Sequence, residues 1–259
     1  MNYIFYKYQG AGNDFIIFDN RKHELDFLSK DQVKMLCDRR FGIGADGLML
    51  LENDSELDFK MVYFNADGAE STMCGNGGRC LVKFAQSLNI FDKETNFLAV
   101  DGHHNAKFSD DLVSLKMIDV TDIKNSNGEF ILNTGSPHYI KFVDDLTNYP
   151  VYEEGKKIRN SADFKAEGIN VNFVAKTNNG IKVRTYERGV EDETLSCGTG
   201  VTAAAIAYAQ LNNLYDQQNI AIETLGGNLN VSFLRTKDSF TEVYLKGPAV
   251  MVYSGSIAI

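Results

Sequence analysis

Positive charge is scarce in this chain of 259 residues, because 26 lysines and arginines stand against 35 aspartates and glutamates, for a net charge of −9. Nucleic acids and other polyanions select for clustered Lys and Arg, so they are excluded as expected partners. No stretch approaches the about 20 apolar residues that span a bilayer. The opening stretch MNYIFYKYQGAGNDF lacks the apolar core of a signal peptide. We therefore expect a soluble cytoplasmic protein that binds a small molecule and no membrane.

Cysteine is also rare. Cys37, Cys74, Cys80 and Cys197 are too few and too scattered for a disulfide framework, and no His/Cys cluster has the spacing of a zinc site. A chain of this length buries a substantial core without disulfides or a structural metal, as one large domain or two of ordinary size. We expect four reduced thiols and no metal.

Short strand-like runs recur along the chain, whereas helical patterning is clear in three places only. The runs are Tyr3 to Tyr8, Phe15 to Asp19, Leu48 to Leu51, Phe59 to Phe64, Leu112 to Met117, Lys182 to Glu187 and Glu242 to Lys246, and the expected helices are Lys30 to Arg39, Asn76 to Leu88 and Thr199 to Asn212. This mixture indicates an α+β protein rather than an alternating parallel sheet.

Two of these helices open in the same way, with Cys74-Gly75-Asn76-Gly77 and with Cys197-Gly198-Thr199-Gly200, 123 residues apart. At that offset the Leu-Asn exits of the two helices also coincide. Chance is the alternative explanation, because glycine turns are common. The pattern favours an internal duplication into two pseudo-symmetric domains, 1–120 and 121–246, with a boundary in the polar stretch 119–129.

A cysteine just before a helix has its thiolate favoured by unpaired backbone N–H groups and by the helix dipole. That setting can lower a thiol pKa from ~8.5 to about 3.5–7.5, and the following glycines let several N–H groups face a carboxylate. One such turn alone is more often structural. If two facing domains supply one thiol each, a carbon between Cys74 and Cys197 can lose its proton to one sulfur and gain one from the other.

Cofactor motifs are missing. The string FGIGADG contains a formal G-x-G-x-x-G at Gly42, Gly44 and Gly47, but it follows a helical segment and enters a strand, the reverse of a dinucleotide fingerprint. No lysine lies in a pyridoxal phosphate motif. We expect no cofactor. The remaining polar candidates are Asn13, Asn65, His138, Asn170, Glu187 and Arg188, each of which taken singly is more often a turn former or a surface residue.

Read together, several strings resemble the diaminopimelate epimerase family along essentially the whole chain. They are KYQGAGNDF from Lys7, FGIGADG from Phe41, FNADGAESTMCGNGGRC from Phe64, GSPH from Gly135, YERGV from Tyr186 and ETLSCGTG from Glu193. The resemblance implies two similar domains, each a mixed β-sheet or barrel wrapped around a central helix, with residues 247–259 completing the first. It also implies an enzyme, commonly a homodimer, that interconverts LL- and meso-diaminopimelate for lysine and cell-wall precursor synthesis without metal or pyridoxal phosphate.

Residue roles follow from the same resemblance. Cys197 would remove the α-proton of the LL isomer and Cys74 would protonate the other face. The N–H groups of Gly75, Asn76, Gly198 and Thr199 would hold the reacting carboxylate. The distal amino-acid end would bind Asn65, Asn170 and Arg188, further contacts would come from Asn13 and Glu187, and Glu187 and His138 would tune the thiols.

The chain departs from the family pattern at three places. Ser136 stands where many members have asparagine, Gly47 stands where some have glutamine, and Val190 to Glu193 is one residue longer than usual. Two rival functions stay open at this point. A proline or hydroxyproline racemase shares the two-cysteine mechanism but usually has histidine where this chain has Asn76, and a non-catalytic amino-acid binder or thiol redox sensor would not exchange the α-proton.

Overall fold

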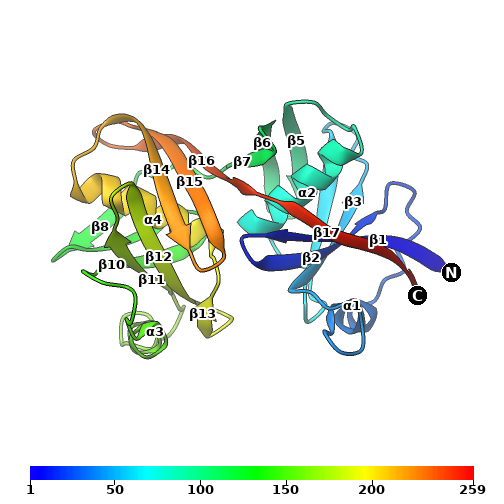
Figure 1. The fold of residues 1–259 in the computed structure, drawn as a ribbon, viewed down its shortest axis with the longest axis horizontal. Coiled ribbons are helices and arrows are strands. Elements are labelled where there is room, and N and C mark those ends of the chain that lie inside the picture. Colours follow the sequence, from blue (N-terminus) through cyan, green and yellow to red (C-terminus); the bar gives the residue numbers. More distant parts are fainter. The chain divides into compact units, whose positions relative to one another are not determined.

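The computed structural model describes all residues, 1–259, and the chain divides into two compact units. Unit 1 consists of Met1–Leu115 and Gly247–Ile259, and unit 2 consists of Lys116–Lys246 (Figure 1). That the units are separate domains with a boundary at residue 120 stays a prediction. None of the helices is long and apolar enough to cross a membrane.

Unit 1 is a mixed sheet with two helices. Its elements are β1 (Asn2–Gly10), β2 (Asn13–Asp19), α1 (Lys30–Cys37), β3 (Gly47–Glu52), β4 (Phe59–Asn65), α2 (Gly75–Ser87), β5 (Glu94–Ala99), β6 (Gly102–Ser109), β7 (Leu112–Lys116) and β17 (Val250–Ala258). Neighbouring strands follow the order β17, β1, β2, β3, β4, β5, β6, β7. The pairs β2–β3 and β4–β5 are parallel, and the others are antiparallel.

Unit 2 is also a mixed sheet with two helices. Its elements are β8 (Ile123–Ser126), β9 (Glu129–Asn133), β10 (Pro137–Phe142), α3 (Val151–Arg159), β11 (Asn170–Lys176), β12 (Gly180–Glu187), β13 (Asp192–Thr194), α4 (Gly198–Leu211), β14 (Asp216–Thr224), β15 (Gly227–Arg235) and β16 (Phe240–Pro248). The order is β8, β9, β10, β11, β12, β14, β15, β16, with β13 paired to β12. Here the parallel pairs are β10–β11 and β12–β14.

The two units repeat one topology. In each, a short helix (α1 or α3) joins the first parallel pair, and a long helix (α2 or α4) joins the second. The register also repeats, because Phe15 pairs with Gly47 in unit 1 and His138 pairs with Asn170 in unit 2. Both partners are shifted by the 123 residues that separate the two cysteines. The predicted α+β fold of two pseudo-symmetric halves is confirmed.

The long helices form the centre of their units. Ten of the 14 residues of α4 are buried, because its sequence GTGVTAAAIAYAQL is small and apolar on all sides. It packs against β9 to β12, β14 and β15, and α2 packs in the same way against β1, β2 and β3. Each long helix thus packs against several strands of its own unit.

One helix escaped the sequence patterns. The segment VYEEGKKIR forms α3, although only three helices were predicted. It buries just Val151 and Gly155, so it lacks the apolar stripe that identifies a helix. A Cβ at Gly155 would lie 2.4 Å from Cβ of Tyr186, so close packing on β12 explains a glycine inside a helix.

The first and last strands of the chain pair with each other. β17 lies antiparallel to β1 from Asn2 opposite Ala258 to Gln9 opposite Val250, and both chain ends lie at the same end of unit 1 (Figure 1). The amino group of Met1 donates to the carbonyl of Ile259 at 3.2 Å. The sheet of unit 1 is therefore completed by residues from the far end of the sequence.

Candidate active site

Cys74 and Cys197 are the N-cap residues of α2 and α4. Both have extended backbone, with φ −90° and ψ 131° at Cys74 and φ −114° and ψ 113° at Cys197. Neither first turn contains an acidic residue. Each thiol therefore stands beside the first-turn N–H groups and the positive end of a helix dipole.

The other two cysteines lie in the core of unit 1. Cys37 and Cys80 are buried, and none of the four forms a disulfide. Burial raises the pKa of Cys37 to about 11 and that of Cys80 to about 12. Both therefore stay protonated near neutral pH and fill space in the core.

In unit 1 the predicted polar residues gather at one sheet edge. Asn13 begins β2, Gly47 begins β3 and Asn65 ends β4. Because β2 and β3 run parallel and β4 runs antiparallel to β3, these three strand ends lie at the same side of the sheet. The Cys74 thiol donates to Oδ1 of Asn13 at 3.7 Å, and Nδ2 of Asn13 donates to Asp46 at 2.5 Å. The Asn13 amide is thus fixed with its acceptor toward the thiol.

The corresponding edge of unit 2 brings Ser136, Asn170 and Arg188 together. Nδ2 of Asn170 donates to Oγ of Ser136 at 3.0 Å, and Oδ1 of Asn170 accepts from the Arg188 backbone N–H at 2.9 Å. One guanidinium nitrogen of Arg188 donates to the same hydroxyl at 3.3 Å. The serine that departs from the family pattern therefore orients two predicted substrate ligands.

A chain of hydrogen bonds runs from Cys197 into the core of unit 2. The Cys197 thiol lies 3.5 Å from the Thr199 hydroxyl, which lies 2.9 Å from Nε2 of His138. Nδ1 of His138 lies 2.9 Å from Oδ1 of Asn172, whose Nδ2 donates to Thr185. Because the Asn172 oxygen only accepts, Nδ1 carries the hydrogen and Nε2 accepts from Thr199.

His138 is neutral in this arrangement. Its side chain is fully buried, and burial lowers its pKa to about 4, with the Arg188 charge acting in the same direction. It therefore cannot act on Cys197 as a cation. Its Nε2 is linked to Cys197 only through Thr199, whose hydroxyl is left as an acceptor toward the thiol.

The other predicted residues have structural partners of their own. Glu187 ends β12, and its carboxylate accepts from the Thr194 hydroxyl at 2.9 Å. Asn76 is buried in the first turn of α2, where its side-chain oxygen accepts from Arg79 at 2.9 Å. Its side-chain oxygen is therefore engaged within the protein.

Gly47 has no room for a side chain. A Cβ there would lie 2.6 Å from the Tyr63 ring and 2.7 Å from the carbonyl of Phe64. Tyr63 therefore occupies the space that a glutamine would need. The FGIGADG string containing Gly47 lies between α1 and β3, as predicted, with Gly44 at φ +81° and its carbonyl bonded to Lys7.

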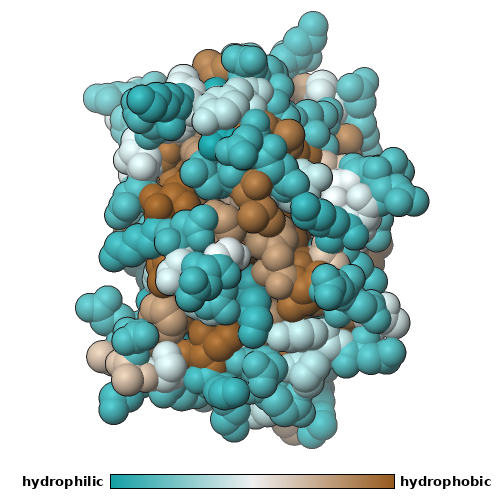
Figure 2. All heavy atoms as spheres, turned by 90° about the vertical axis from the view of Figure 1, so that its left-hand side faces the viewer, coloured by the Kyte–Doolittle hydropathy of each residue, from teal (hydrophilic) through white to brown (hydrophobic).

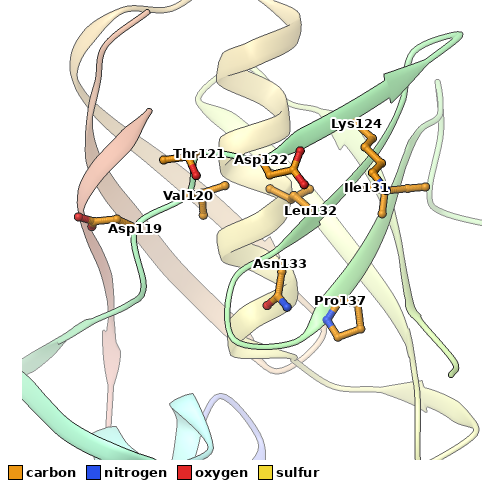
Figure 3. Close-up of a pocket in the computed structure, with 9 residues that line it drawn as sticks. All are labelled: Asp119, Val120, Thr121, Asp122, Lys124, Ile131, Leu132, Asn133 and Pro137. Carbon is orange, nitrogen blue, oxygen red and sulfur yellow. The ribbon is translucent and has the colours of Figure 1, made fainter. Parts of the chain in front are cut away.

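A surface recess of unit 2 lies apart from these residues. It has a volume of about 270 Å³ and is lined by Asp119 to Asp122, Lys124, Ile131 to Asn133 and Pro137 (Figure 3). None of the predicted site residues lines it. Figure 2 shows one face of unit 2, where hydrophilic side chains predominate and apolar ones gather in the middle.

Several residues of the site carried no signal in the sequence. The sequence analysis did not predict Asn172, Thr134 and Arg79. Thr134 supports the first turn of α4, because its hydroxyl donates to the Thr199 carbonyl at 2.8 Å. The 123-residue offset could have indicated Asn172. It aligns Phe15 and Met49 with His138 and Asn172, so that an apolar pair in one half stands opposite a polar pair in the other.

Solved structures define the class of fold. A Bacillus anthracis phenazine biosynthesis protein of the PhzF family has a TM-score of 0.75 at 13% identity, with both chains fully covered. A hydroxyproline epimerase from Agrobacterium vitis has a TM-score of 0.70 at 14% identity, covering 100% of this chain and 93% of that chain. At such identities the likeness shows the fold alone, which is the fold of the PhzF and proline racemase-like proteins.

Sequence comparison narrows the class to one family. The family model described as diaminopimelate epimerase matches residues 5–117 and 130–252. A protein named diaminopimelate epimerase from Flavobacterium psychrophilum is 52% identical, covering 97% of this chain and 99% of the relative. Another from Chlorobaculum tepidum is 42% identical, covering 96% and 99%. The chain belongs to the diaminopimelate epimerase family, and the resemblance of the motifs is confirmed.

Proposed function

We propose that this chain interconverts LL- and meso-diaminopimelate with the thiols of Cys74 and Cys197. Family membership over nearly the whole chain supports the substrate and the reaction. The observation that carries the mechanism is the pair of N-cap cysteines on the two long helices. Their recurrence in equivalent positions of a repeated topology favours a common task over two unrelated structural roles.

The proposed reaction moves two protons. The Cys197 thiolate takes the α-proton of the LL isomer, and the electron pair left on carbon is delocalised into the adjacent carboxylate. The Cys74 thiol then gives its proton to the opposite face, so the configuration inverts and the two sulfurs exchange protonation states. The N–H groups of Gly75, Asn76, Gly198 and Thr199 would stabilise the charge that grows on the carboxylate.

Distal recognition would rest on the polar residues at the two sheet edges. The Arg188 guanidinium suits a carboxylate, because its planar fork can donate two parallel hydrogen bonds. Ser136 and Asn170 hold that side chain and its backbone in place. Asn65, Asn13 and Glu187 would add polar contacts to the amino-acid ends. A proline-sized substrate would leave this set of ligands unused, which disfavours the racemase alternative.

Tuning of Cys197 would come from the hydrogen-bond chain through Thr199. With Nε2 of neutral His138 accepting from the Thr199 hydroxyl, that hydroxyl can accept from the Cys197 S–H. This arrangement favours the protonated form of Cys197 and directs its hydrogen toward Thr199. A role for Glu187 in tuning a thiol is part of the same proposal and rests on the family resemblance.

Several wider properties belong to the proposal as well. Catalysis would need neither metal nor pyridoxal phosphate, and the enzyme would act in the cytoplasm as a homodimer, as the family resemblance implies. The exposed apolar residues Val250, Met251, Val252 and Tyr253 on β17 support association with a second copy. Sedimentation of the purified protein tests the dimer directly.

Deuterium uptake tests the two-thiol mechanism. Cys74→Ala and Cys197→Ala are each expected to abolish epimerisation, because one face of the carbon loses its acid or base. Each variant should still exchange the α-proton of one isomer in deuterated water: the LL isomer in Cys74→Ala and the D-centre of the meso isomer in Cys197→Ala. The wild-type rate should follow a bell in pH, since one thiol must be ionised and the other protonated.

The controls are Cys37→Ser and Cys80→Ser, which remove thiols that lie outside the proposed site. Substantial epimerase activity in Cys74→Ala would require a one-base mechanism and would remove the second thiol from the proposal. A wild-type protein that binds diaminopimelate without any deuterium uptake would be a binder or a thiol sensor.

A further inference from the structure

Arg79 carries a charge inside unit 1 that no acidic side chain balances. Its side chain is fully buried in α2, five residues after Cys74. One terminal nitrogen donates to the Gly75 carbonyl at 3.2 Å and the other to Oδ1 of Asn76 at 2.9 Å, while Nε has no hydrogen-bond partner. Arginine stays protonated even when buried, so a cation sits at the first turn of α2.

Neighbouring charged groups are paired among themselves. On the adjacent strands and loop, Lys7 and Arg39 bind Asp14 at 2.7 and 2.6 Å, and Arg39 also binds Asp46 at 2.7 Å. Those two cations and two anions form a closed group. Asp101, which accepts from the Met73 N–H at 3.3 Å, is paired with His104.

The remaining ionisable groups around Arg79 are neutral apart from one. Burial raises the pKa of Cys80 to about 12, and burial also raises that of Tyr8 on β1. Burial lowers the pKa of Arg79 itself, while the charges of Cys80 and Cys74 oppose that effect. Cys74 is thus the group beside Arg79 that can carry a negative charge near neutral pH, and its ionisation would end the hydrogen bond that its thiol donates to Asn13.

The equivalent position on α4 is neutral. Thr202 stands five residues after Cys197, is fully buried, and donates to the Gly198 carbonyl at 2.9 Å. Its hydroxyl thus satisfies the same carbonyl of the first turn that Arg79 satisfies on α2. The hydrogen bond repeats in both halves, and the charge does not.

The side chains packed against the first turns of the two helices also differ in polarity. A Cβ at Gly77 would meet Phe15 and Met49, whereas one at Gly200 would meet Asn172, the partner of His138. Cys197 therefore has a neutral hydrogen-bond chain, and Cys74 has a buried cation.

We propose that Arg79 is a positioning residue that holds Cys74 as the thiolate in the free enzyme, with Cys197 as the protonated partner. This inference rests on the proposed role of Cys74. The free enzyme is then ready to remove a proton from the D-centre of the meso isomer. Action on the LL isomer first requires the proton of Cys197 to leave and Cys74 to be protonated.

The pH profile of alkylation by iodoacetamide, a neutral reagent that reacts with thiolates, tests this on the free protein. Mass spectrometry reads each cysteine separately. In the wild type, the pH at the midpoint of the alkylation profile should be lower for Cys74 than for Cys197 by about one pH unit or more. Arg79→Thr keeps a hydroxyl of the kind that serves at Thr202 and removes the charge, so the Cys74 midpoint should rise by about 1–3 units while that of Cys197 stays.

Two further variants separate charge from structure. Thr202→Val removes the matching hydrogen bond from α4 without changing charge and should leave the Cys74 midpoint in place. Arg79→Lys keeps the charge and should retain most of the lowered midpoint. A wild-type Cys74 midpoint at or above that of Cys197 overturns the proposal without any variant, and so does an unmoved Cys74 midpoint in Arg79→Thr. No substrate is present, so these outcomes are independent of the deuterium test.

Discussion

Arg188 is the residue on which the proposed recognition of the distal carboxylate most depends. Its two terminal nitrogens are anchored by the Ser136 hydroxyl and by the carbonyl of Glu167 at 3.1 Å. Its backbone N–H is held by Asn170. A guanidinium fixed at these points presents its remaining N–H groups in a set direction, which a flexible ammonium cannot do.

Arg188→Lys should therefore impair binding although it conserves charge. Hydrogen bonds to charged groups contribute about 1.5–3 kcal/mol, so we expect the Michaelis constant for diaminopimelate to rise roughly 10- to 100-fold with a smaller change in kcat. Steady-state kinetics measure this. Arg159→Lys, in an arginine that pairs with Glu191 at 3.1 Å, is the matched control. Equal Michaelis constants in Arg188→Lys and the wild type would remove Arg188 from the distal end.

His138 should make the fold sensitive to acid. Its pKa of about 4 in the folded chain lies below the usual 6.5, so the unfolded chain binds the proton first as pH falls. Its contribution is fully present above pH ~6.5 and declines toward pH 4, by roughly 3 kcal/mol in all. Urea unfolding at pH 7 and pH 4.5 should show a smaller loss of stability in His138→Gln than in the wild type. Identical losses would mean that His138 is protonated in the fold.

At the scale of elements, the start of α4 depends on a glycine more strictly than the start of α2 does. A Cβ at Gly200 would lie 2.4 Å from Nδ2 of Asn172. That amide is held between His138 and Thr185 and cannot yield. A Cβ at Gly77 would meet Phe15 and Met49 at 3.3 and 3.4 Å, and Met49 is a flexible neighbour.

Gly200→Ala should consequently displace the turn that carries Cys197 and Thr199. We expect a loss of about 1–3 kcal/mol in stability from overpacking and a marked fall in epimerase rate. Gly77→Ala should change stability by less than about 1 kcal/mol, because a gain in helix propensity offsets tighter contacts. Thermal unfolding and activity assays compare the two. A Gly200→Ala enzyme as stable and active as Gly77→Ala would show that the Asn172 contact relaxes.

Sequence patterns located the elements better than the contacts between them. All seven strand-like runs lie within strands, apart from Met117, which follows the end of β7. The Cys-Gly turns located both long helices because turn chemistry is local. Helix α3 was missed because it buries one apolar side chain and a glycine. The Ser136–Arg188 and His138–Thr199 contacts join residues more than 50 apart, so no local pattern could indicate them.

At the scale of the whole molecule, unit 1 depends on a strand from the other end of the chain. β17 pairs along nearly the full length of β1, and Gly255 lies beneath the Phe5 ring, where even a Cβ would come within 2.9 Å. Without β17, the N–H and C=O groups of β1 on that side would be exposed at a sheet edge, which invites aggregation.

Truncation after Pro248 is therefore expected to unfold unit 1 and to spare unit 2. Limited proteolysis followed by mass spectrometry should find rapid cleavage within residues 1–115 and protection within 116–246. Tyr253→Ser is the control, since it keeps the β17 backbone and loses only the ring contact with Phe5. Protection of residues 1–115 in the truncated chain would show that β17 is dispensable to the fold.

The pairing of β1 with β17 also reverses the usual order of events during synthesis. Domains generally fold as the ribosome releases them, the amino-terminal one first. Here the residues that close the sheet of unit 1 are translated after all of unit 2, which is complete in sequence at Lys246. The half that carries Cys197 can therefore begin to fold before the strand that closes the half carrying Cys74 has been made.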